Sequence, residues 1–292
     1  MQTFKNKISN IRFLFAVFSL LFVFGCGKND LPQFNQLSKI RVMALTTPTP
    51  EVNPGTTVTI TPVISDITAT ATDTLTDSVA ACIDIGVAYG VLPTCDNNPS
   101  KVVIHANRTL ALPGQTESWT GSADSFSVTV PATGIIFYNR SAMDQYNGIN
   151  YLIEYTLRSS QGSEVKSFRR IVVSDTAKAN KNQNPPMTDI FSDGLAMISL
   201  NLGGAMQLST DLSAGSAEAY SLQLSDGSML GKSEYLSITW FMTDGETKRM
   251  RTDVGVTNAY TAPSSMPSGR SVYILAVARD NRGGVSVVKK KF

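Results

Sequence analysis

Apolar and polar residues alternate along much of the chain with a period of two. The segments 57–61, 125–130 and 149–158 are the clearest, with apolar or aromatic residues at every second position. Only Leu152 breaks the alternation in the third segment. β-branched and aromatic residues in this pattern are typical of antiparallel strands with one buried and one solvated face. The sequence therefore predicts an all-β protein.

Glycine and proline mark turns between the predicted strands. Asn-Pro-Gly at 53–55, Gln-Gly at 161–162 and Arg-Gly-Gly at 282–284 each stand between two alternating segments. Many short strands separated by such turns are typical of β-sandwiches, whereas α/β proteins need long amphipathic helices. The segment where we expect a short helix or an irregular loop is 142–147.

A polar segment at 177–187 (AKANKNQNPPM) divides the pattern into two parts. It has no apolar period and contains two consecutive prolines, which favours an extended linker. Each part ends with an apolar strand, Arg-x-x-x-Gly and a closing strand, at 155–173 and 275–288. We therefore expect two sandwich domains, at 38–176 and 188–292.

The first 25 residues have the composition of an export signal. Three basic residues precede an apolar run at 13–24, which is too short to span a membrane as a helix. Val23-Phe24-Gly25-Cys26 resembles the bacterial lipobox, in which the cysteine becomes the first mature residue and carries lipid. The resemblance implies a signal peptide at 1–25, lipidation of Cys26 and a tether at 26–37. An ordinary secretory signal cut elsewhere is the alternative.

Removal of this segment changes the charge balance. The whole chain has 25 Lys and Arg against 23 Asp and Glu, a net charge of +2. Residues 1–25 contain three of the basic residues and none of the acidic ones, which leaves 22 against 23 and a net charge of −1. A near-neutral chain without a basic patch is not expected to bind nucleic acid. The single histidine, His105, excludes multi-histidine metal centres, and we expect no metal and no cofactor.

Two cysteines remain besides Cys26. Cys82 and Cys95 lie 13 positions apart in a segment with glycines and a proline that let it fold back. An even pair in an exported chain predicts a disulfide. The alternatives are a redox pair, which usually has Cys-x-x-Cys, and a metal site, which needs more ligands. Between comparable turns the first part is roughly 28 residues longer than the second, and the excess falls at these cysteines. We therefore expect the disulfide to pin an insertion.

With these features the chain resembles the bacterial surface lipoproteins that have tandem immunoglobulin-like domains, including the polycystic-kidney-disease type. The matching stretches are KIRVMA (39–44), PEVNPGTTV (50–58) and 82–95 in the first part, and NPP (184–186), ITWF (238–241), TAP (261–263) and VARDNRGG (277–284) in the second. The resemblance covers most of residues 38–292. It implies two immunoglobulin-like antiparallel β-sandwiches and a location at the cell envelope, and it transfers no catalytic residue.

Few residues are candidates for catalysis. His105 lies in an alternating segment, and we expect it to face outward, because no second group is expected to orient the imidazole. The carboxylates that could pair for glycosidase chemistry lie in a Thr-rich stretch that predicts loop and strand edge: Asp66, Asp73, Asp77 and Asp84. Four aspartates could contribute ligands for calcium, but an ordinary role as turn residues is the preferred interpretation: Asp175, Asp189, Asp193 and Asp280. We therefore expect that the protein is not an enzyme.

The two tryptophans have different surroundings. Trp240 shares a period-two face with Leu236, Ile238 and Met242, which predicts a core position facing the opposite sheet. Trp119 lies in a polar, turn-rich segment. Packing under a loop is the preferred interpretation for Trp119, and contact with a binding partner is the alternative.

These patterns predict a non-enzymatic, lipid-anchored protein of the cell envelope. We expect its immunoglobulin-like domains to serve adhesion or the binding of a surface protein or glycan, with the membrane contacted through Cys26. A structural or assembly component of an envelope complex is the alternative. Gly27 after the lipidated cysteine favours, by analogy with enteric sorting, the outer membrane or cell surface over the inner membrane.

Overall fold

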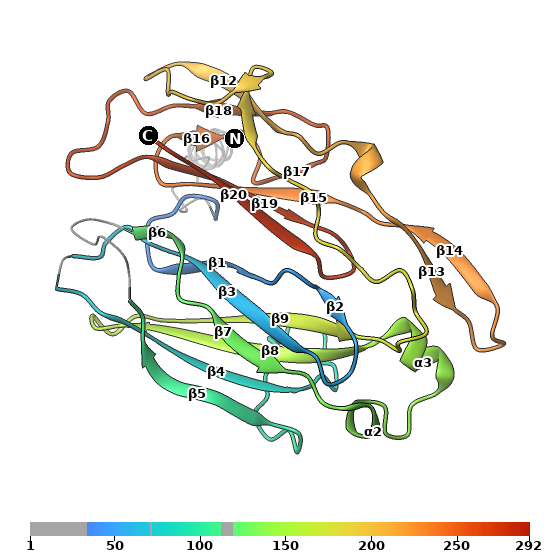
Figure 1. The fold of residues 1–292 in the computed structure, drawn as a ribbon. Helices are drawn as coiled ribbons and strands as arrows, with labels where there is room; N and C mark the ends of the chain where they lie inside the picture. The colour runs from blue at the N-terminus through green and yellow to red at the C-terminus, as the bar shows by residue number, and fades with distance from the viewer. Residues whose placement is uncertain (1–33, 71, 112–118) are drawn as a thin grey trace, which may run out of the picture. The chain divides into compact units, whose positions relative to one another are not determined.

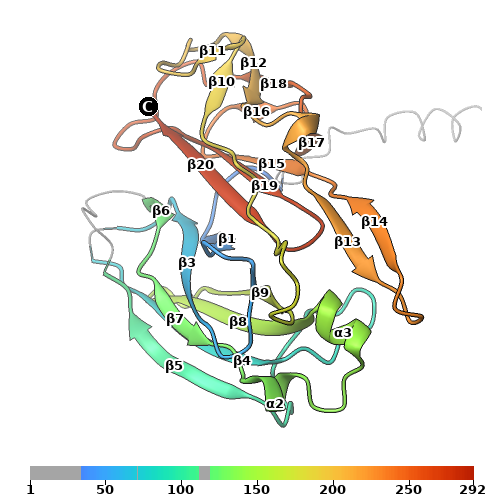
Figure 2. The same cartoon turned by 45° about the vertical axis from the view of Figure 1, so that its right-hand side comes forward.

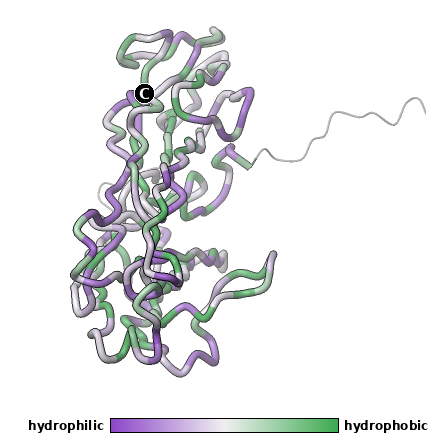
Figure 3. The backbone as a smooth tube through the Cα atoms, turned by 90° about the vertical axis from the view of Figure 1, so that its right-hand side faces the viewer, coloured by the Kyte–Doolittle hydropathy of each residue, from purple (hydrophilic) through white to green (hydrophobic). Residues whose placement is uncertain are grey.

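The computed structural model describes residues 34–70, 72–111 and 119–292. The fold is nearly all β, with 46% of residues in strands and 5% in helices, and its antiparallel sheets pack as β-sandwiches. Hydrophobic and hydrophilic residues follow each other in short stretches along the backbone (Figure 3), as strands with one buried face require. The predicted fold class is confirmed.

The strands between residues 41 and 173 form two sheets (Figure 1). In the first sheet, β3 (Thr57–Asp66) pairs with β1 (Arg41–Thr46), β6 (Trp119–Ser122) and β7 (Phe126–Thr129). The second sheet has the order β2 (Glu51–Val52), β9 (Glu164–Val173), β8 (Ile149–Ser159), β4 (Leu75–Ile83) and β5 (Val102–Thr109). The pair β2–β9 is parallel, and the other pairs in these two sheets are antiparallel.

Two short helices connect β7 to β8. They are α2 (Thr133–Ile136) and α3 (Ala142–Asn147). The second of them is the short helix expected at 142–147, and Ser141 and Asp144 form a capping box at its start.

The alternation in β8 divides its side chains between two environments. Every second residue from Tyr151 to Leu157 is buried in the core between the two sheets. Leu152, which breaks the alternation, is buried on the other face against Cys82 and Cys95. The exception in the pattern therefore has a physical cause, because the disulfide covers this part of the outer face of the sheet.

Cys82 and Cys95 form the predicted disulfide, with a Cα–Cα distance of 5.7 Å. Cys82 lies in β4, and Cys95 lies in the long connection from β4 to β5. The bond and Leu152 form a small apolar cluster of their own, apart from the core between the sheets. The disulfide thus fastens the connection to the outer face of the sheet.

We expect the double variant Cys82→Ala/Cys95→Ala to lose roughly 3 kcal/mol of unfolding free energy, because the bond closes a short loop and restricts the unfolded chain. Urea unfolding of the wild type with and without dithiothreitol, beside the double variant, measures this loss. The reductant should bring the wild type to the level of the variant and leave the variant unchanged. Alkylation of either cysteine in the unreduced wild type would contradict the bond.

Most of the strands between residues 190 and 291 form a second pair of sheets (Figure 2). One sheet has the order β11 (Leu195–Ala196), β10 (Ile190–Ser192), β12 (Ala205–Thr210), β18 (Asn258–Thr261) and β16 (Glu246–Thr247). The other has the order β17 (Arg251–Asp253), β15 (Ser237–Met242), β19 (Tyr273–Arg279) and β20 (Val285–Lys291). Trp240 of β15 is fully buried between them and donates to Thr252 Oγ1 at 3.1 Å, which confirms its predicted core position.

A separate hairpin precedes β15. It consists of β13 (Ala219–Gln223) and β14 (Met229–Ser233), which pair only with each other among the described strands. A 3₁₀ turn, η1 (Ala214–Ser216), leads into it.

Two arginines, the buried Arg169 and the half-buried Arg279, connect the two pairs of sheets through β1. Arg169 of β9 donates to the carbonyls of Leu45 and Gly283, both at 2.9 Å. Arg279 of β19 donates to the carbonyl of Met43 at 2.8 Å. Burial lowers the pKa of Arg169 to about 10. Residues 34–292 form one compact unit, so the division into domains at 177–187 stays a prediction.

The first described residues contact the second pair of sheets. Leu37 is fully buried and its N–H donates to the carbonyl of Met242 at 2.7 Å, while the N–H of Met242 donates to the carbonyl of Asn35 at 3.0 Å. The end of the predicted tether therefore attaches to β15, although β1 follows it directly in the sequence.

Candidate functional site

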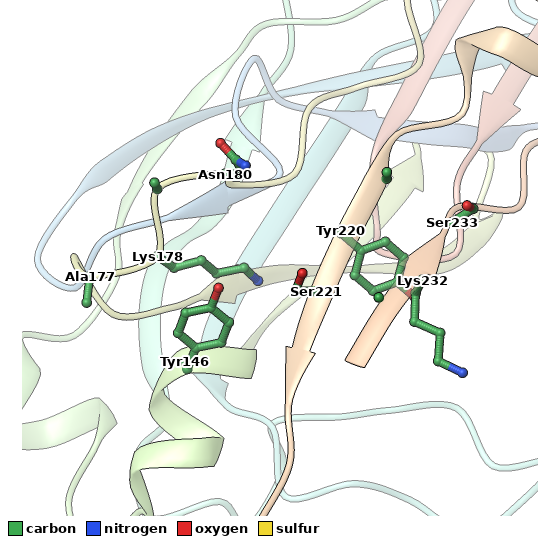
Figure 4. Close-up of a pocket in the computed structure, with 11 residues that line it drawn as sticks. Tyr146, Ala177, Lys178, Asn180, Tyr220, Ser221, Lys232 and Ser233 are labelled. Atoms are coloured by element: carbon green, nitrogen blue, oxygen red, sulfur yellow. The ribbon is translucent and has the colours of Figure 1, made fainter. Parts of the chain in front are cut away.

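A polar groove lies between α3, the segment after β9 and the β13–β14 hairpin. Its first hollow has a volume of about 650 Å³. Tyr146 of α3 and Tyr220 of β13 stand on opposite sides, with Ser221 between them and Lys178 beside Tyr146 (Figure 4). The other lining residues are small or polar: Ala177, Ala179, Asn180, Ala219, Gly231, Lys232 and Ser233.

Two further hollows continue the groove. The second, of about 360 Å³, shares Lys178 and Tyr220 with the first. The third, of about 430 Å³, shares Gly148, Asn150 and Arg170 with the second. Asp84, Gly86 and Val87, at the start of the connection that the disulfide fastens, line its far end. The three hollows therefore form a row.

The end of α3 positions one wall of this groove. Gly148 follows the helix with φ of 98°, and a Cβ atom there would collide with the side chain of Val172 in β9. Glycine thus lets the helix lie close against the sheet and sets the place of Tyr146. Asn147 Nδ2 donates to the carbonyl of Gln223 at 2.9 Å, and the N–H of Gln223 donates to Asn147 Oδ1 at 2.8 Å. These two bonds hold the hairpin, and with it Tyr220, beside the helix.

A buried carboxylate lies between the two tyrosines. Glu51 of β2 pairs with Lys178 Nζ at 2.7 Å and with Arg282 Nη2 at 3.0 Å. The ammonium of Lys178 lies 5.7 Å from the ring centre of Tyr146, and the guanidinium of Arg282 lies 4.5 Å from that of Tyr220. We call this chain of five residues the Glu51 relay. Each tyrosine ring is fixed by a cation, and both cations are fixed by one carboxylate.

The Glu51 carboxylate is stabilised in its charged form. Burial acts to raise its pKa, but hydrogen bonds from Lys178, the Ser174 hydroxyl and the Asn182 N–H outweigh burial and hold the pKa below its ordinary value. Glu234 also pairs with Arg282, at 3.0 Å, and here burial raises the pKa. Glu51 is therefore the anion on which the relay depends.

The segment 177–187 takes part in the relay. Lys178 and Asn182 are buried, and the N–H of Asn182 donates to Glu51 Oε2 at 2.8 Å. Asn184 Nδ2 donates to the carbonyl of Thr47 at 2.7 Å, and the N–H of Val285 donates to Asn184 Oδ1 at 2.9 Å. The polar residues that predicted a linker thus bond to both pairs of sheets.

The site residues predicted from the sequence lie away from the tyrosines. Cys26 is outside the described residues. Trp119 begins β6, where its backbone pairs with Asp66, and its side chain is outside the described part. The disulfide of Cys82 and Cys95 contributes only by holding the connection at the far end of the groove.

The prediction that His105 faces outward is wrong. Its Nε2 lies 2.8 Å from Asp77 Oδ1, and its ring packs edge-on against Phe126 with centres 5.6 Å apart. Bulges in the pairing of β4 with β5 shift the register beside it, and a shift of one residue moves a side chain to the other face. Among the described residues, Asp77 is the one side-chain hydrogen-bond partner of His105, and no serine reaches the imidazole.

Asp77 and Asp66 also differ from the prediction of loop and edge. Asp77 lies in β4, between β8 and β5, and is fully buried. It accepts two bonds from Arg108, at 3.1 and 2.7 Å, and this contact raises the pKa of Arg108. Burial, and to a lesser extent the charge of Asp77, raises the pKa of the Tyr155 hydroxyl. Asp66 ends β3 and is buried too. A Thr-rich stretch thus forms inner strands because its apolar residues occupy alternate positions.

The aspartates weighed as calcium ligands lie in separate contacts. Asp280 accepts from the N–H groups of Arg282 and Gly284, both at 2.7 Å, and Asp189 pairs with Lys290 at 2.5 Å. Within the described ranges, no three His, Cys, Asp or Glu side chains converge as a group that could hold a metal ion. In the same part of the chain, no helix is both long and apolar enough to cross a membrane.

Sequence reasoning missed the groove. Tyr146, Tyr220 and Glu51 belong to no motif, and the partners in the relay are up to 231 positions apart. One signal was available in the segment 177–187, whose run of Lys, Asn and Gln could have indicated hydrogen bonding to both neighbours as well as a linker.

No protein-family model and no curated protein matches the chain. Similar solved structures include the transglutaminase of red sea bream, which is 9% identical over 88% of this chain with a TM-score of 0.28; this chain spans 31% of its length. The periplasmic chaperone SfaE is 9% identical over 85% of this chain and 98% of its own, with a TM-score of 0.27. SGBP-B of the Bacteroides ovatus mixed-linkage glucan utilization locus, solved with a mixed-linkage heptasaccharide, is 8% identical over 88% of this chain and 70% of its own, with a TM-score of 0.19. At this level of similarity they assign neither a family nor an activity.

Proposed function

We propose that this protein is an exported, lipid-anchored and non-enzymatic binding protein of the cell envelope, and that its ligand occupies the groove between Tyr146 and Tyr220. The observation that carries the proposal is the Glu51 relay. It fixes two half-buried aromatic rings, from residues 74 positions apart, on the two sides of one hollow. Rings held in place before binding lose little freedom when a ligand arrives, which favours affinity.

Export and anchoring rest on the sequence together with the disulfide. A disulfide fits an oxidising compartment outside the cytosol. The lipobox-like residues 23–26 supply the anchor, and Gly27 favours the outer membrane or cell surface. The eight residues from Cys26 to Phe34 reach at most about 29 Å, so the sandwiches would stand close to the membrane.

Metabolic labelling with palmitate tests the anchor. We expect the wild type to incorporate label and to sediment with membranes, and Cys26→Ala to do neither, because one cysteine carries the lipid. Cys82→Ala/Cys95→Ala is the matched control and should label like the wild type. Equal labelling of Cys26→Ala and the wild type would contradict lipid anchoring at Cys26. It would not affect the proposal that the groove binds a ligand.

One observation favours the second candidate, an assembly component of an envelope complex. The connection from β4 to β5 exposes large apolar side chains on an uncharged stretch: Ile85, Val87, Tyr89, Val91 and Leu92. Exposed apolar residues in this density are typical of a protein-binding surface. Co-purification of envelope proteins in fixed proportion, lost on replacing Ile85 and Leu92 with Ser, would support this candidate.

A further inference from the structure

We propose that the groove binds a linear, uncharged oligosaccharide that occupies the three hollows in a row. The inference rests on the proposed function, because it names the ligand of the same site. It is carried by the chemistry of the lining, the pairing of its charges and the length of the groove.

The lining offers hydrogen bonds along its whole length. Four side-chain amides line the hollows, and they differ in what they can offer a ligand: Asn147, Asn150, Asn180 and Asn281. Asn147 is bonded to Gln223 and Asn281 Oδ1 accepts from the N–H of Tyr235, whereas the side-chain amides of Asn150 and Asn180 have no partner among the described residues. Ser221 and Ser233 add hydroxyls. Amides and hydroxyls donate and accept at once, as the hydroxyl groups of a sugar do. A ligand rich in hydroxyls can therefore bond at each hollow.

The large apolar surface in the first hollow is confined to the two tyrosine ring faces. Tyr146 and Tyr220 are amphipathic, with a flat apolar face and a polar hydroxyl. The C–H face of a sugar ring can pack on such a face while its hydroxyls bond to the neighbouring amides. A protein ligand would instead need an apolar centre to its contact surface. The first hollow has none, since its other lining residues are alanines, glycine and polar residues.

Of the five cations that line the hollows, three are paired with carboxylates. Lys178 and Arg282 pair with Glu51, and Arg170 pairs with Asp84 at 2.5 Å. Of the other two, Lys232 points away from the tyrosines (Figure 4) and Arg140 lines only the third hollow. A cation already paired with a buried carboxylate has little left to offer an anionic ligand. The groove therefore favours an uncharged chain over an acidic one.

The shape of the groove selects for length. Neighbouring hollows share lining residues, so a ligand can pass from the first to the third without leaving the groove. A linear chain of several rings makes contacts in all three, and a single sugar makes contacts in one. Affinity should therefore rise with chain length up to the number of rings that the row holds.

Calorimetric titration of the mature full chain in detergent tests the proposal. The probes are cello-, laminari-, manno- and chito-oligosaccharides of two to six rings. We expect at least one series to bind with an affinity that rises with length. Tyr146→Ala and Tyr220→Ala should each weaken binding about tenfold or more. Tyr138→Ala is the matched control, since this tyrosine is largely exposed and lines none of the three hollows.

Asn180→Ala tests the groove independently, in case the tyrosine variants fail to fold. Its side chain is exposed at the wall of the first hollow, so it should fold normally and weaken binding roughly three- to fivefold. Absence of binding in all four series, or binding unchanged in the groove variants, would overturn the inference. A parallel binding assay with an array of extended peptides distinguishes failure of the sugar inference from failure of the proposed binding groove. Tyrosine-dependent peptide binding would refute the sugar and retain the groove, and binding of neither probe class would refute both.

Discussion

Glu51→Gln is expected to lower the free energy of unfolding by about 3–5 kcal/mol. Glutamine keeps the size of the side chain but removes the charge that Lys178 and Arg282 share, and these two cations are themselves nearly buried. A buried cation left without its partner costs several kcal/mol. Urea unfolding followed by circular dichroism measures the loss. The same variant should weaken ligand binding, because both tyrosines lose the support of their cations.

The loss of unfolding free energy in Glu51→Gln should be larger at neutral pH than in acid. The pKa of Glu51 in the folded protein lies below its ordinary value of 4.5. The stabilisation by its charge is therefore complete well above pH 4.5 and is lost as the pH falls through the lower, folded-state pKa. The difference between wild type and Glu51→Gln should be full near pH 7 and shrink in acid.

Glu234→Gln is the matched control for this prediction. Glu234 shares Arg282 with Glu51, but burial raises its pKa, so the folded protein already disfavours its charged form. We expect a loss of about 1 kcal/mol, as for one hydrogen bond. Equal losses in Glu51→Gln and Glu234→Gln would contradict the claim that Glu51 is the anion on which the relay depends.

Asp77→Asn should also cost about 3–5 kcal/mol. The carboxylate is fully buried in β4 and holds Arg108 with two bonds and His105 with one. The neutral amide removes the charge that compensates the partly buried guanidinium of Arg108. Thermal and urea unfolding of the variant measure the loss.

Two further variants separate charge from packing at Asp77. Asp77→Asn/Arg108→Met removes the unpaired cation as well and should recover part of the stability. Asp96→Asn breaks the exposed pair with Lys101 and should leave unfolding unchanged. If the double variant is no more stable than Asp77→Asn, packing of the strand and not charge explains the effect.

The parts of the fold that follow local rules were predictable. Period-two alternation predicted β8, the capping residues Ser141 and Asp144 accompany the predicted helix α3, and two cysteines 13 positions apart predicted the disulfide. Trp240 was predictable because its apolar neighbours at period two leave one face for the core.

The polar interior was not predictable in the same way. A carboxylate such as Glu51 or Asp77 is buried only when its cations are at hand, and these come from residues far away in the chain. The period of a strand tells which face a residue occupies, and it does not tell whether that face is later covered. His105 was misplaced for a related reason, because bulges in β4 and β5 change the face without leaving a sign in the alternation.

The attachment of residues 35–37 to Met242 affects how the molecule responds to tension. A pull on the N-terminal segment acts first on β15, in the second pair of sheets, through the bonds of Asn35 and Leu37 to Met242. The chain then continues directly into β1, and the arginines Arg169 and Arg279 connect β1 back to the second pair. A pull on the N-terminal segment therefore acts on both pairs of sheets, on one through β15 and on the other through β1.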